Sequence, residues 1–419
     1  MLLSLTRPAK LWVINLRNIR SYHIAKKKII KDEHYIAKHI FQKIKAKGPI
    51  TVAEYMKQVL TNTVAGYYMR KDMFGETGDF VTSPEITQMF GEMIAVWFLN
   101  EWQKMGSPKP FQIVELGPGR GTLSNDILKV FNHFKSLHKA SLHLIEISPT
   151  LSDIQAELLC RANFCDENAA AYKKGISHNG VPVHWYKRLN DVPNNFTLFI
   201  AHEFFDALPI HKFHRKYNGY KEVLIDVDIS NPKSNEHKFK YVLARNHTPM
   251  SKVLIKPNES REHVETSPDS ILIYKEICER IKLSGGIALI CDYGHDGSGT
   301  DTFRAFKDHK QVDPLEMPGS ADLTADVDFS LIREAANEVG GIISLGPTTQ
   351  KNFLLKTGLE YRFKSLAQNI KNKKQLENLK ECFKFLTDED KMGERFKFCA
   401  LFPETVKKIL DRYPVIGFS

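Results

Sequence analysis

The chain has 419 residues, of which 42% are hydrophobic and 26% are charged, as is usual for a globular protein. Its formal charge of +10 invites a nucleic-acid ligand, but eight basic residues lie in the acid-free segment 1–31 and the remainder is nearly balanced. No stretch approaches the roughly 18 uninterrupted apolar residues of a membrane span. We therefore expect neither a nucleic-acid partner nor a membrane span.

The basic segment 1–31 is predicted to be a mitochondrial transit peptide. Leucine, isoleucine, valine and tryptophan alternate with its cations, so it can form an amphipathic helix without acidic residues. This prediction places the protein in the mitochondrial matrix; the alternative is a basic, disordered N-terminus. The six cysteines form no CxxC pair and have no histidine cluster at zinc spacing, so we expect free thiols and no metal site.

Residues 32–110 carry a helical pattern and are predicted to form an N-terminal helical cap. Within 85–102, apolar residues recur at helical spacing on one face. Ser83 is predicted to cap this helix, with Pro84 in the first turn. A glycine-containing loop, residues 75–85, precedes the helix.

From residue 111 onward, short apolar strands alternate with helical stretches, which predicts an α/β core of residues 111–357 with a mostly parallel sheet covered on both faces. Residues 210–260 interrupt this rhythm as an inserted β segment. Residues 358–419 are lysine-rich and predicted to be a helical extension. The strands are expected at 111–116, 141–148, 181–187, 196–201, 286–293, 341–345 and 352–357, the last two paired as a closing hairpin.

The sequence VELGPGRG places glycines at positions 117, 119 and 121 between a strand and a helix. Gly117, Gly119 and Gly121 permit positive φ angles and let a ligand approach the backbone closely. The P-loop pattern GxxxxGK[ST] is absent, and a dinucleotide fingerprint needs a small residue where Thr122 stands. The spacing therefore favours S-adenosylmethionine as the cofactor.

Two acidic residues at strand ends fit that cofactor. Glu146 ends the second strand, where its carboxylate is expected to accept both ribose hydroxyls. Glu115 is expected to reach the amino group of the methionine part. The alternative is a tight turn without a ligand, in which the three glycines would lower stability for no gain.

The sequence HEFFDALP follows the fourth predicted strand, at the sheet edge where such folds bind ligands. Glu203 and Asp206 are expected to clamp an arginine guanidinium, which stays charged at any working pH, and to orient one nitrogen toward the methyl group. Phe204 and Phe205 are expected to wall the site and exclude water. The alternative is structural: a helix cap by Glu203 and a turn at Asp206.

These residues together resemble the MidA-like methyltransferase family. The resemblance implies a seven-stranded class I (Rossmann-like) methyltransferase fold and symmetric dimethylation of an arginine in a core subunit of the matrix arm of respiratory complex I. It also implies that Thr82 and Ser83 lie near the cofactor. The matching stretches are GDFVTSPEITQMFGE (78–92), VELGPGRGTL (114–123), AHEFFDALP (201–209), ETSP (265–268), GGIALICDYG (285–294) and PGSADLTADVDF (318–329).

The chain departs from this family pattern at two positions. His202 stands where many relatives have asparagine, and Asp326 where many have histidine. A role for His202 as general base is open, since a single histidine is more often structural. Three other functions stay open as well: a non-catalytic, cofactor-binding assembly chaperone, a small-molecule methyltransferase and, disfavoured by Thr122, a nicotinamide oxidoreductase.

Overall fold

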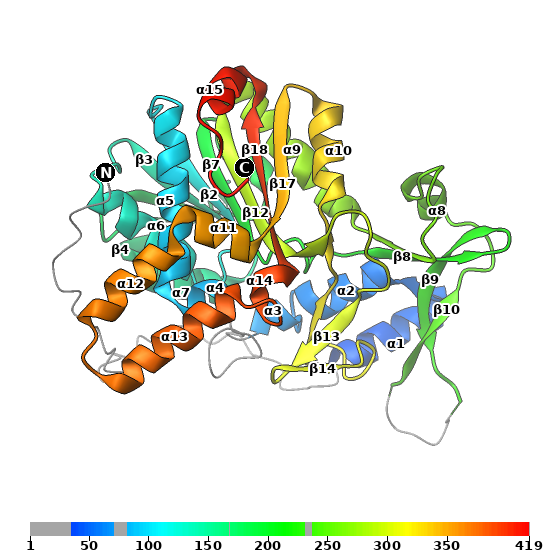
Figure 1. Cartoon of the computed structure of the whole chain (residues 1–419). Helices are drawn as coiled ribbons and strands as arrows, with labels where there is room; N and C mark the ends of the chain where they lie inside the picture. Colours follow the sequence, from blue (N-terminus) through cyan, green and yellow to red (C-terminus); the bar gives the residue numbers. More distant parts are fainter. Residues whose placement is uncertain (1–34, 71–81, 167, 231–236, 419) are drawn as a thin grey trace.

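The computed structural model describes residues 35–70, 82–166, 168–230 and 237–418 (Figure 1). The predicted transit peptide lies outside the described residues, as does most of the glycine-containing loop predicted at 75–85. Within the described part of the chain, none of the helices has the length and apolar composition that a membrane span requires.

A ten-stranded mixed sheet forms the centre of the molecule. The five neighbouring strands β12, β7, β2, β3 and β6 run parallel, and β18 runs antiparallel between β12 and β17. The seven strands from β17 to β6 are the core that the α/β prediction requires. Along the sheet the order is β17 (Ile342–Thr349), β18 (Phe396–Pro403), β12 (Gly286–His295), β7 (Phe196–His202), β2 (Phe111–Leu116), β3 (Ala140–Ile145), β6 (Pro182–Tyr186), β5 (Lys173–Ser177) and β4 (Cys160–Cys165), with β16 (Val327–Asp328) beside β12.

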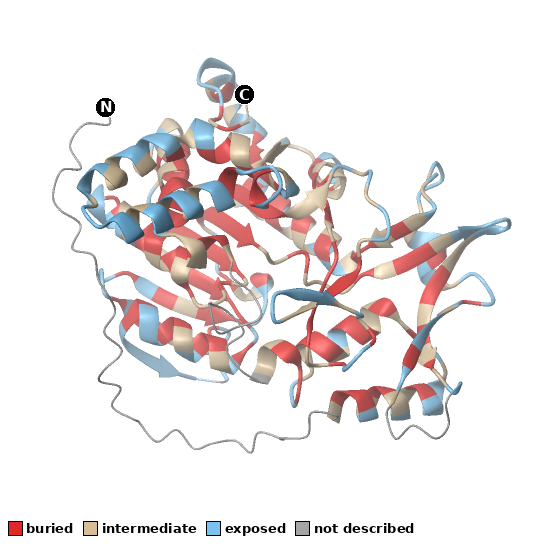
Figure 2. Ribbon diagram, turned by 60° about the horizontal axis from the view of Figure 1, so that its bottom comes forward, coloured by how far each residue is buried: buried red, intermediate tan, exposed pale blue. Residues whose placement is uncertain are grey.

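The central strands are apolar along their whole length because both faces of the sheet are covered. Every residue of β2 and β7 is buried. Successive side chains of a strand point to opposite faces, so Leu198 and Ile200 join one apolar cluster while Phe199 and Ala201 join another. Figure 2 shows this buried interior.

Helices pack on each face of the sheet. One apolar cluster unites the sheet with α5 (Gln88–Lys104), α6 (Thr122–His133), α7 (Pro149–Leu159) and α11 (Gln350–Thr357). The other cluster unites it with α9 (Pro268–Ser284) and α10 (Ser330–Val339). This three-layer arrangement confirms the predicted α/β class and leaves the carboxyl ends of the parallel strands as the place for a ligand.

A second body, which we call the cap, packs beside the main sheet around an apolar cluster of its own (Figure 1). The residues of this cluster come from three separate stretches of the chain, 36–67, 210–239 and 303–325. The cap comprises α1 (Tyr35–Lys47), β1 (Ile50–Thr51), α2 (Val52–Thr61), β8 (His211–Lys216), β9 (Gly219–Val227), β10 (Phe239–Leu243), β11 (His263–Thr266), β13 (Arg304–Lys307), β14 (Lys310–Val312) and β15 (Asp322–Thr324).

The prediction of a closing hairpin between 341–345 and 352–357 is wrong. The partner of β17 (Ile342–Thr349) is β18 (Phe396–Pro403), which lies beyond four intervening helices, and residues 350–357 form helix α11. Thr349 starts that helix by accepting a hydrogen bond from the backbone of Asn352, and Phe353 and Leu354 then face the core. A short apolar run does not by itself distinguish a strand from a buried helix.

The N-terminal helices also differ from the prediction. The helix expected over 85–102 is broken at Thr87, whose side chain caps α5, and the short α4 (Ser83–Ile86) precedes it. Thr82, and not Ser83, occupies the cap position of α4. Helices α1 and α2 and Tyr67 of α3 belong to the cap cluster, whereas α5 packs on the main sheet.

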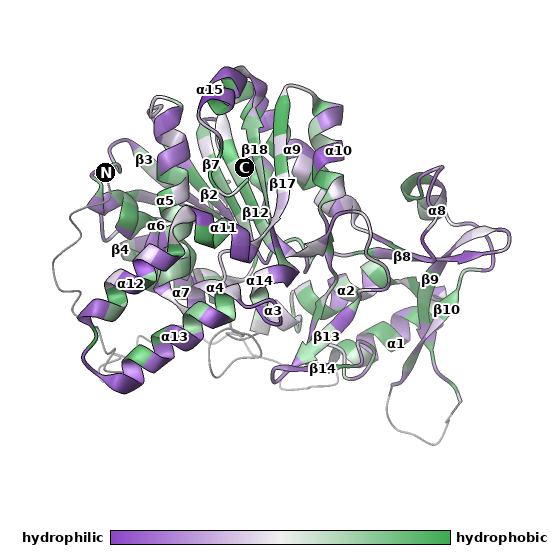
Figure 3. Ribbon diagram, viewed as in Figure 1, coloured by the Kyte–Doolittle hydropathy of each residue, from purple (hydrophilic) through white to green (hydrophobic). Residues whose placement is uncertain are grey.

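The C-terminal part, expected to be helical throughout, also contributes strand β18 to the sheet. Its helices α12 and α13 carry hydrophilic residues on their outer faces, whereas the hydrophobic residues gather on the central strands (Figure 3). The remaining short elements are α3 (Tyr67–Arg70), α8 (Pro249–Leu254), α14 (Met392–Arg395) and α15 (Lys407–Arg412), beside the longer α12 (Leu359–Asn369) and α13 (Lys373–Thr387).

Candidate active site

The glycine loop lies between β2 and α6, as the sequence predicts. Gly117, Gly119 and Gly121 all have positive φ angles, of 65°, 54° and 86°. A Cβ atom added to Gly117 would stand 2.7 Å from the Phe204 ring. Glycine is therefore required at position 117 both by the backbone conformation and by the close approach of that ring.

Glu146 directly follows β3 and is held by neighbouring groups at both carboxylate oxygens. The backbone N–H of Ser148 donates to one oxygen at 2.7 Å, and Gln155 Nε2 donates to the other at 3.0 Å. The same amide donates to the carbonyl of Gly119 at 2.7 Å, and Trp185 Nε1 fixes the amide by donating to its oxygen at 2.9 Å. Gln155 thus ties the glycine loop to Glu146, a role that no sequence pattern indicated.

A cavity of about 460 Å³, which we call the large cavity, joins these residues to the acidic loop after β7. Its size suits a nucleoside together with an acceptor side chain. Its lining includes Gly117, Gly119 and Glu146 as well as Glu203 and Asp206. Apolar residues that can enclose a planar base lie near Glu146; they are Ile145, Ile147, Leu151 and Leu189.

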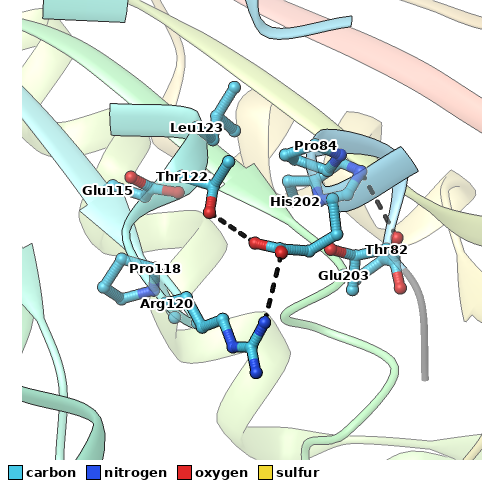
Figure 4. Close-up of a pocket in the computed structure, with 12 residues that line it drawn as sticks. Thr82, Pro84, Glu115, Pro118, Arg120, Thr122, Leu123, His202 and Glu203 are labelled. Carbon is cyan, nitrogen blue, oxygen red and sulfur yellow. Dashed lines mark hydrogen bonds and ion pairs between the residues drawn. The ribbon is translucent and has the colours of Figure 1, made fainter. Parts of the chain in front are cut away.

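A second, smaller cavity of about 40 Å³ lies between the glycine loop and α4 (Figure 4). Glu85 of α4 accepts a hydrogen bond from Thr122 Oγ1 and lies 3.5 Å from Arg120 Nη1, so the two elements are linked by charged groups. Glu115 lines this cavity and accepts a hydrogen bond from Ser124 Oγ, and its contact with the amino group of the cofactor stays a prediction. Thr82 lines both cavities.

The acidic loop is held in an uncommon backbone conformation. Glu203 has a φ angle of 49°, in the left-handed region that non-glycine residues rarely adopt. Residues with such strained backbone conformations are often found at functional sites. The carboxylate of Asp292, within β12, accepts hydrogen bonds from the backbone N–H groups of Phe204, Phe205 and Asp206 at 3.2, 3.0 and 3.4 Å. Asp292 therefore stabilises the loop that presents Glu203.

Burial dominates the electrostatics of this loop. Desolvation, together with the nearby charge of Asp206, raises the pKa of Glu203 well above its ordinary value. Desolvation also raises the pKa of Asp206 to about 7, although the charge of Arg304 lowers it. Two buried carboxylates at one cavity end disfavour their own ionised forms until a cation arrives, so this end is suited to a positively charged group.

His202 lies next to these acids and is uncharged at neutral pH, because burial lowers its pKa to about 3. Its Nε2 atom is 3.4 Å from Glu203 Oε1, and neither atom has a hydrogen-bond partner among the described residues. The imidazole packs against Phe90, with ring centroids 4.9 Å apart. The geometry therefore places a neutral nitrogen beside Glu203 (Figure 4).

Two predicted site residues face away from the cavities. Phe205 packs in the core against Tyr274, with ring centroids 4.4 Å apart, whereas Phe204 lines the large cavity. The Ser83 hydroxyl is buried 3.5 Å from the sulfur of Met392 and does not line either cavity. Phe205 thus does not form the expected wall, and the cofactor contact of Ser83 stays a prediction.

Outside the active site, three side chains of the cap lie at metal-ligand spacing. His214 and His263 face each other across the β8–β11 pair, and Glu262 is 3.4 Å from the nearer imidazole. The expectation that the chain has no metal site therefore stays a prediction.

The burial of Glu146 gives a pH-dependent expectation for stability. Desolvation raises its pKa from 4.5 to about 7, so between these values the folded chain holds a proton that the unfolded chain has lost. The stabilisation that the Glu146 carboxyl contributes is therefore complete below pH 4.5 and is lost as pH rises through about 7. Without ligand, Glu146→Gln should be more stable than the wild type at pH 8 by up to about 3 kcal/mol.

Urea-induced unfolding of both proteins from pH 4 to pH 8 measures this difference. It should shrink toward zero at the acidic end, where the wild-type carboxyl is protonated in both states. A difference that is constant with pH would contradict the assigned burial of the charge.

Comparisons with known proteins agree with this geometry. Residues 93–348 match the sequence family described as S-adenosyl-L-methionine-dependent methyltransferase. The chain is 49% identical over 388 residues to a mitochondrial protein of Drosophila melanogaster named protein arginine methyltransferase NDUFAF7 homolog, covering 92% of this chain and 88% of that one. It is 48% identical to the human mitochondrial protein arginine methyltransferase NDUFAF7, covering 87% and 83%.

A similar fold is found in a crystal structure from Burkholderia thailandensis that contains S-adenosyl-homocysteine. It superposes with a TM-score of 0.71 at 22% identity and covers 92% of this chain and 96% of that one. A second structure from the same organism gives a TM-score of 0.68. At this identity the likeness concerns the fold.

Proposed function

We propose that this chain, which belongs to the S-adenosyl-L-methionine-dependent methyltransferase family together with the mitochondrial NDUFAF7 proteins, methylates a protein arginine. S-adenosyl-L-methionine is its cofactor, and its location is mitochondrial, as the basic N-terminal segment predicted. The enzyme class predicted from the glycine loop is thereby confirmed. The acceptor residue, the acceptor protein and the roles of the site residues are proposals.

The residues at the sugar end of the large cavity fit this cofactor. Glu146 presents a buried carboxylate whose two oxygens are already oriented by Ser148 and Gln155, and a ribose offers two adjacent hydroxyl donors. At Gly117 a Cβ atom would close the space between the loop and the Phe204 ring. We therefore assign the sugar to Glu146 and the methionine part to the glycine loop and Glu115.

The observation that carries the arginine proposal is the buried pair Glu203 and Asp206, which lines the same cavity as Glu146. A permanently charged guanidinium compensates both carboxylates and matches them with parallel N–H donors. A neutral acceptor would leave Glu203 buried without the counter-charge that Arg304 provides near Asp206. The cavity is therefore better suited to arginine than to a neutral small molecule.

When bound, S-adenosyl-L-methionine supplies an electrophilic methyl group on its sulfonium. Glu203 and Asp206 hold the guanidinium so that one nitrogen points along the cavity toward that group, and this orientation contributes much of the rate. Glu203 then accepts the proton that the nitrogen loses. Phe204 excludes water, which strengthens these ionic contacts.

The uncharged His202 lies beside the proposed base. With its Nε2 atom 3.4 Å from Glu203 Oε1, it is placed to share the accepted proton and keep it away from the methyl donor. Because burial keeps the imidazole neutral at working pH, it adds no positive charge that would repel the guanidinium. We propose this supporting role for His202 in place of a role as the primary base.

We further propose that the acceptor is a core subunit of the matrix arm of complex I, that the product is symmetric dimethylarginine and that the enzyme works in the matrix. The resemblance to the MidA-like family implies these points, and the NDUFAF7 names of the relatives support the arginine acceptor. The cap supports a protein substrate, since it adds surface around the acidic end of the cavity.

Mass spectrometry of methylation reactions tests this function. Purified protein is incubated with S-adenosyl-L-methionine and each recombinant matrix-arm core subunit, and the tryptic peptides are analysed. We expect symmetric dimethylarginine at one site of one subunit, and none when the protein is omitted. Methylation at lysine would refute the arginine assignment, and cofactor binding without any methylation would establish a non-catalytic chaperone.

A further inference from the structure

The cap also contributes a carboxylate to the lining of the large cavity. Asp322 lies on β15, its side chain lines the cavity, and the residue is only 4% exposed. Glu203 and Asp206 follow β7 of the main sheet, so the acids of this cavity come from both bodies of the molecule. Asp322 is also near enough for its charge to act on Glu203.

Tyr68 holds Asp322 in place. Its hydroxyl donates to Asp322 Oδ1 at 2.6 Å, and Tyr68 itself lines the cavity. A phenol hydrogen bond orients a carboxylate, whose remaining lone pairs can accept from a further donor. Asp206 of the main body has Arg304, on β13 of the cap, as a nearby cation, and that guanidinium lies 2.6 Å from Asp326.

The shape of the acceptor explains why two acids on one wall are insufficient. A guanidinium is planar and carries five N–H donors directed to three sides. Glu203 and Asp206 stand three residues apart on one loop and can serve the donors that point to the main body. The donors that point to the cap need an acceptor there, and Asp322 is the buried carboxylate that the cap contributes to the cavity lining.

We propose that Asp322 binds the acceptor guanidinium from the cap side and that Tyr68 is its positioning residue. This inference rests on the proposed arginine acceptor. Neither residue was predicted as a site residue, although ADLTADVDF is part of the family resemblance, because the acid is separated from Glu203 by more than a hundred residues of chain.

Tyr68 also connects the acceptor end with the sugar end. Its backbone carbonyl accepts a hydrogen bond from Ser148 Oγ at 2.7 Å, and the backbone N–H of Ser148 donates to Glu146 at 2.7 Å. A continuous chain of contacts therefore runs from the ribose-binding carboxylate through Ser148 and Tyr68 to Asp322. The acceptor wall is thus attached to the residues that hold the cofactor.

Two variants separate recognition from folding. Asp322→Asn keeps the size of the side chain and an oxygen that accepts from Tyr68, but it removes the charge. Tyr68→Phe keeps the ring and removes the orienting hydroxyl. The matched control is Asp328→Asn, which removes another buried carboxylate that does not line either cavity.

The experiment measures kcat and KM for an arginine peptide of the acceptor protein, and the Kd of that peptide for full-length enzyme saturated with S-adenosyl-homocysteine. For Asp322→Asn we expect KM and Kd for the peptide to rise at least about tenfold, as for loss of a hydrogen bond to a charged group. Affinity for S-adenosyl-homocysteine should change less than about twofold, since the sugar end is intact. Tyr68→Phe should give a smaller rise in the same constants.

The proposal is overturned if Asp322→Asn binds the peptide as tightly as the wild type, or if the control variant weakens peptide binding equally. Equal loss of cofactor and peptide affinity in Asp322→Asn would assign the residue to structure and also overturn it. If the proposed arginine acceptor is itself wrong, the wild-type enzyme will neither bind nor methylate the arginine peptide, which distinguishes that result from a failure of the proposal for Asp322.

Discussion

Replacing Glu203 by glutamine is expected to lower kcat for arginine methylation by about a thousandfold, the combined scale of losing a general base and a charged transition-state contact. Glutamine has the same shape but cannot take up the proton and does not offset the guanidinium charge. The affinity for S-adenosyl-homocysteine should stay within about threefold of the wild type, because the ribose is held elsewhere. Single-turnover assays and isothermal titration calorimetry measure the two quantities.

The matched control for this variant is Glu222→Gln. Glu222 is a buried glutamate of β9 that pairs with His211 in the cap and does not line either cavity. It tests whether removal of any buried carboxylate lowers activity. Near-wild-type kcat in Glu203→Gln would remove Glu203 from the mechanism, whereas a large loss in the control would show that the assay reports on folding.

Replacing Glu146 by glutamine is expected to weaken cofactor binding by about a hundredfold, the scale of losing a charged, two-point hydrogen bond in a buried site. Because burial raises the pKa of Glu146 to about 7, the wild-type affinity should rise between pH 6 and pH 8 as the carboxylate ionises. The variant has no such group, and its affinity should be nearly constant over this range. Calorimetric titration with S-adenosyl-homocysteine measures both effects.

Glu157→Gln is the matched control for that experiment, because Glu157 is an exposed residue of the same region, on helix α7. Its cofactor affinity and pH dependence should equal those of the wild type. If Glu146→Gln bound the cofactor as tightly as this control, the ribose would have to be held by other residues.

The parts of the fold that the sequence predicted are those whose pattern is local. The strand, glycine loop and helix from β2 to α6 lie within a short stretch, and the apolar run, the glycines and the amphipathic helix each have a distinct periodicity. Strand β18 was missed because the strands with which it pairs, β12 and β17, lie far from it along the chain. The apolar run at 352–357 is short enough to fit either a strand or a helix, and the N-cap at Thr349 favours the helix that is observed.

The candidate site divides in the same way. Gly117, Glu146 and Glu203, which line the large cavity, could be predicted as candidates because each directly follows a strand, where ligands bind in such sheets. Gln155 and Asp292 could not, since their function is to hold another residue in place through contacts that only the folded chain brings together. Sequence patterns name the groups that meet a ligand more readily than the groups that support them.

The cap is built around an interior of its own, to which three remote stretches of the chain contribute. Damage to that interior, for example at Ile225 or Ala305, is transmitted to one wall of the cavity and leaves the glycine loop supported by the main sheet. Inherited or engineered defects in this protein should therefore fall into two biochemical groups. Defects in the sheet are expected to abolish the binding of S-adenosyl-L-methionine. Defects in the cap are expected to leave that binding intact and to weaken the binding of the methyl acceptor.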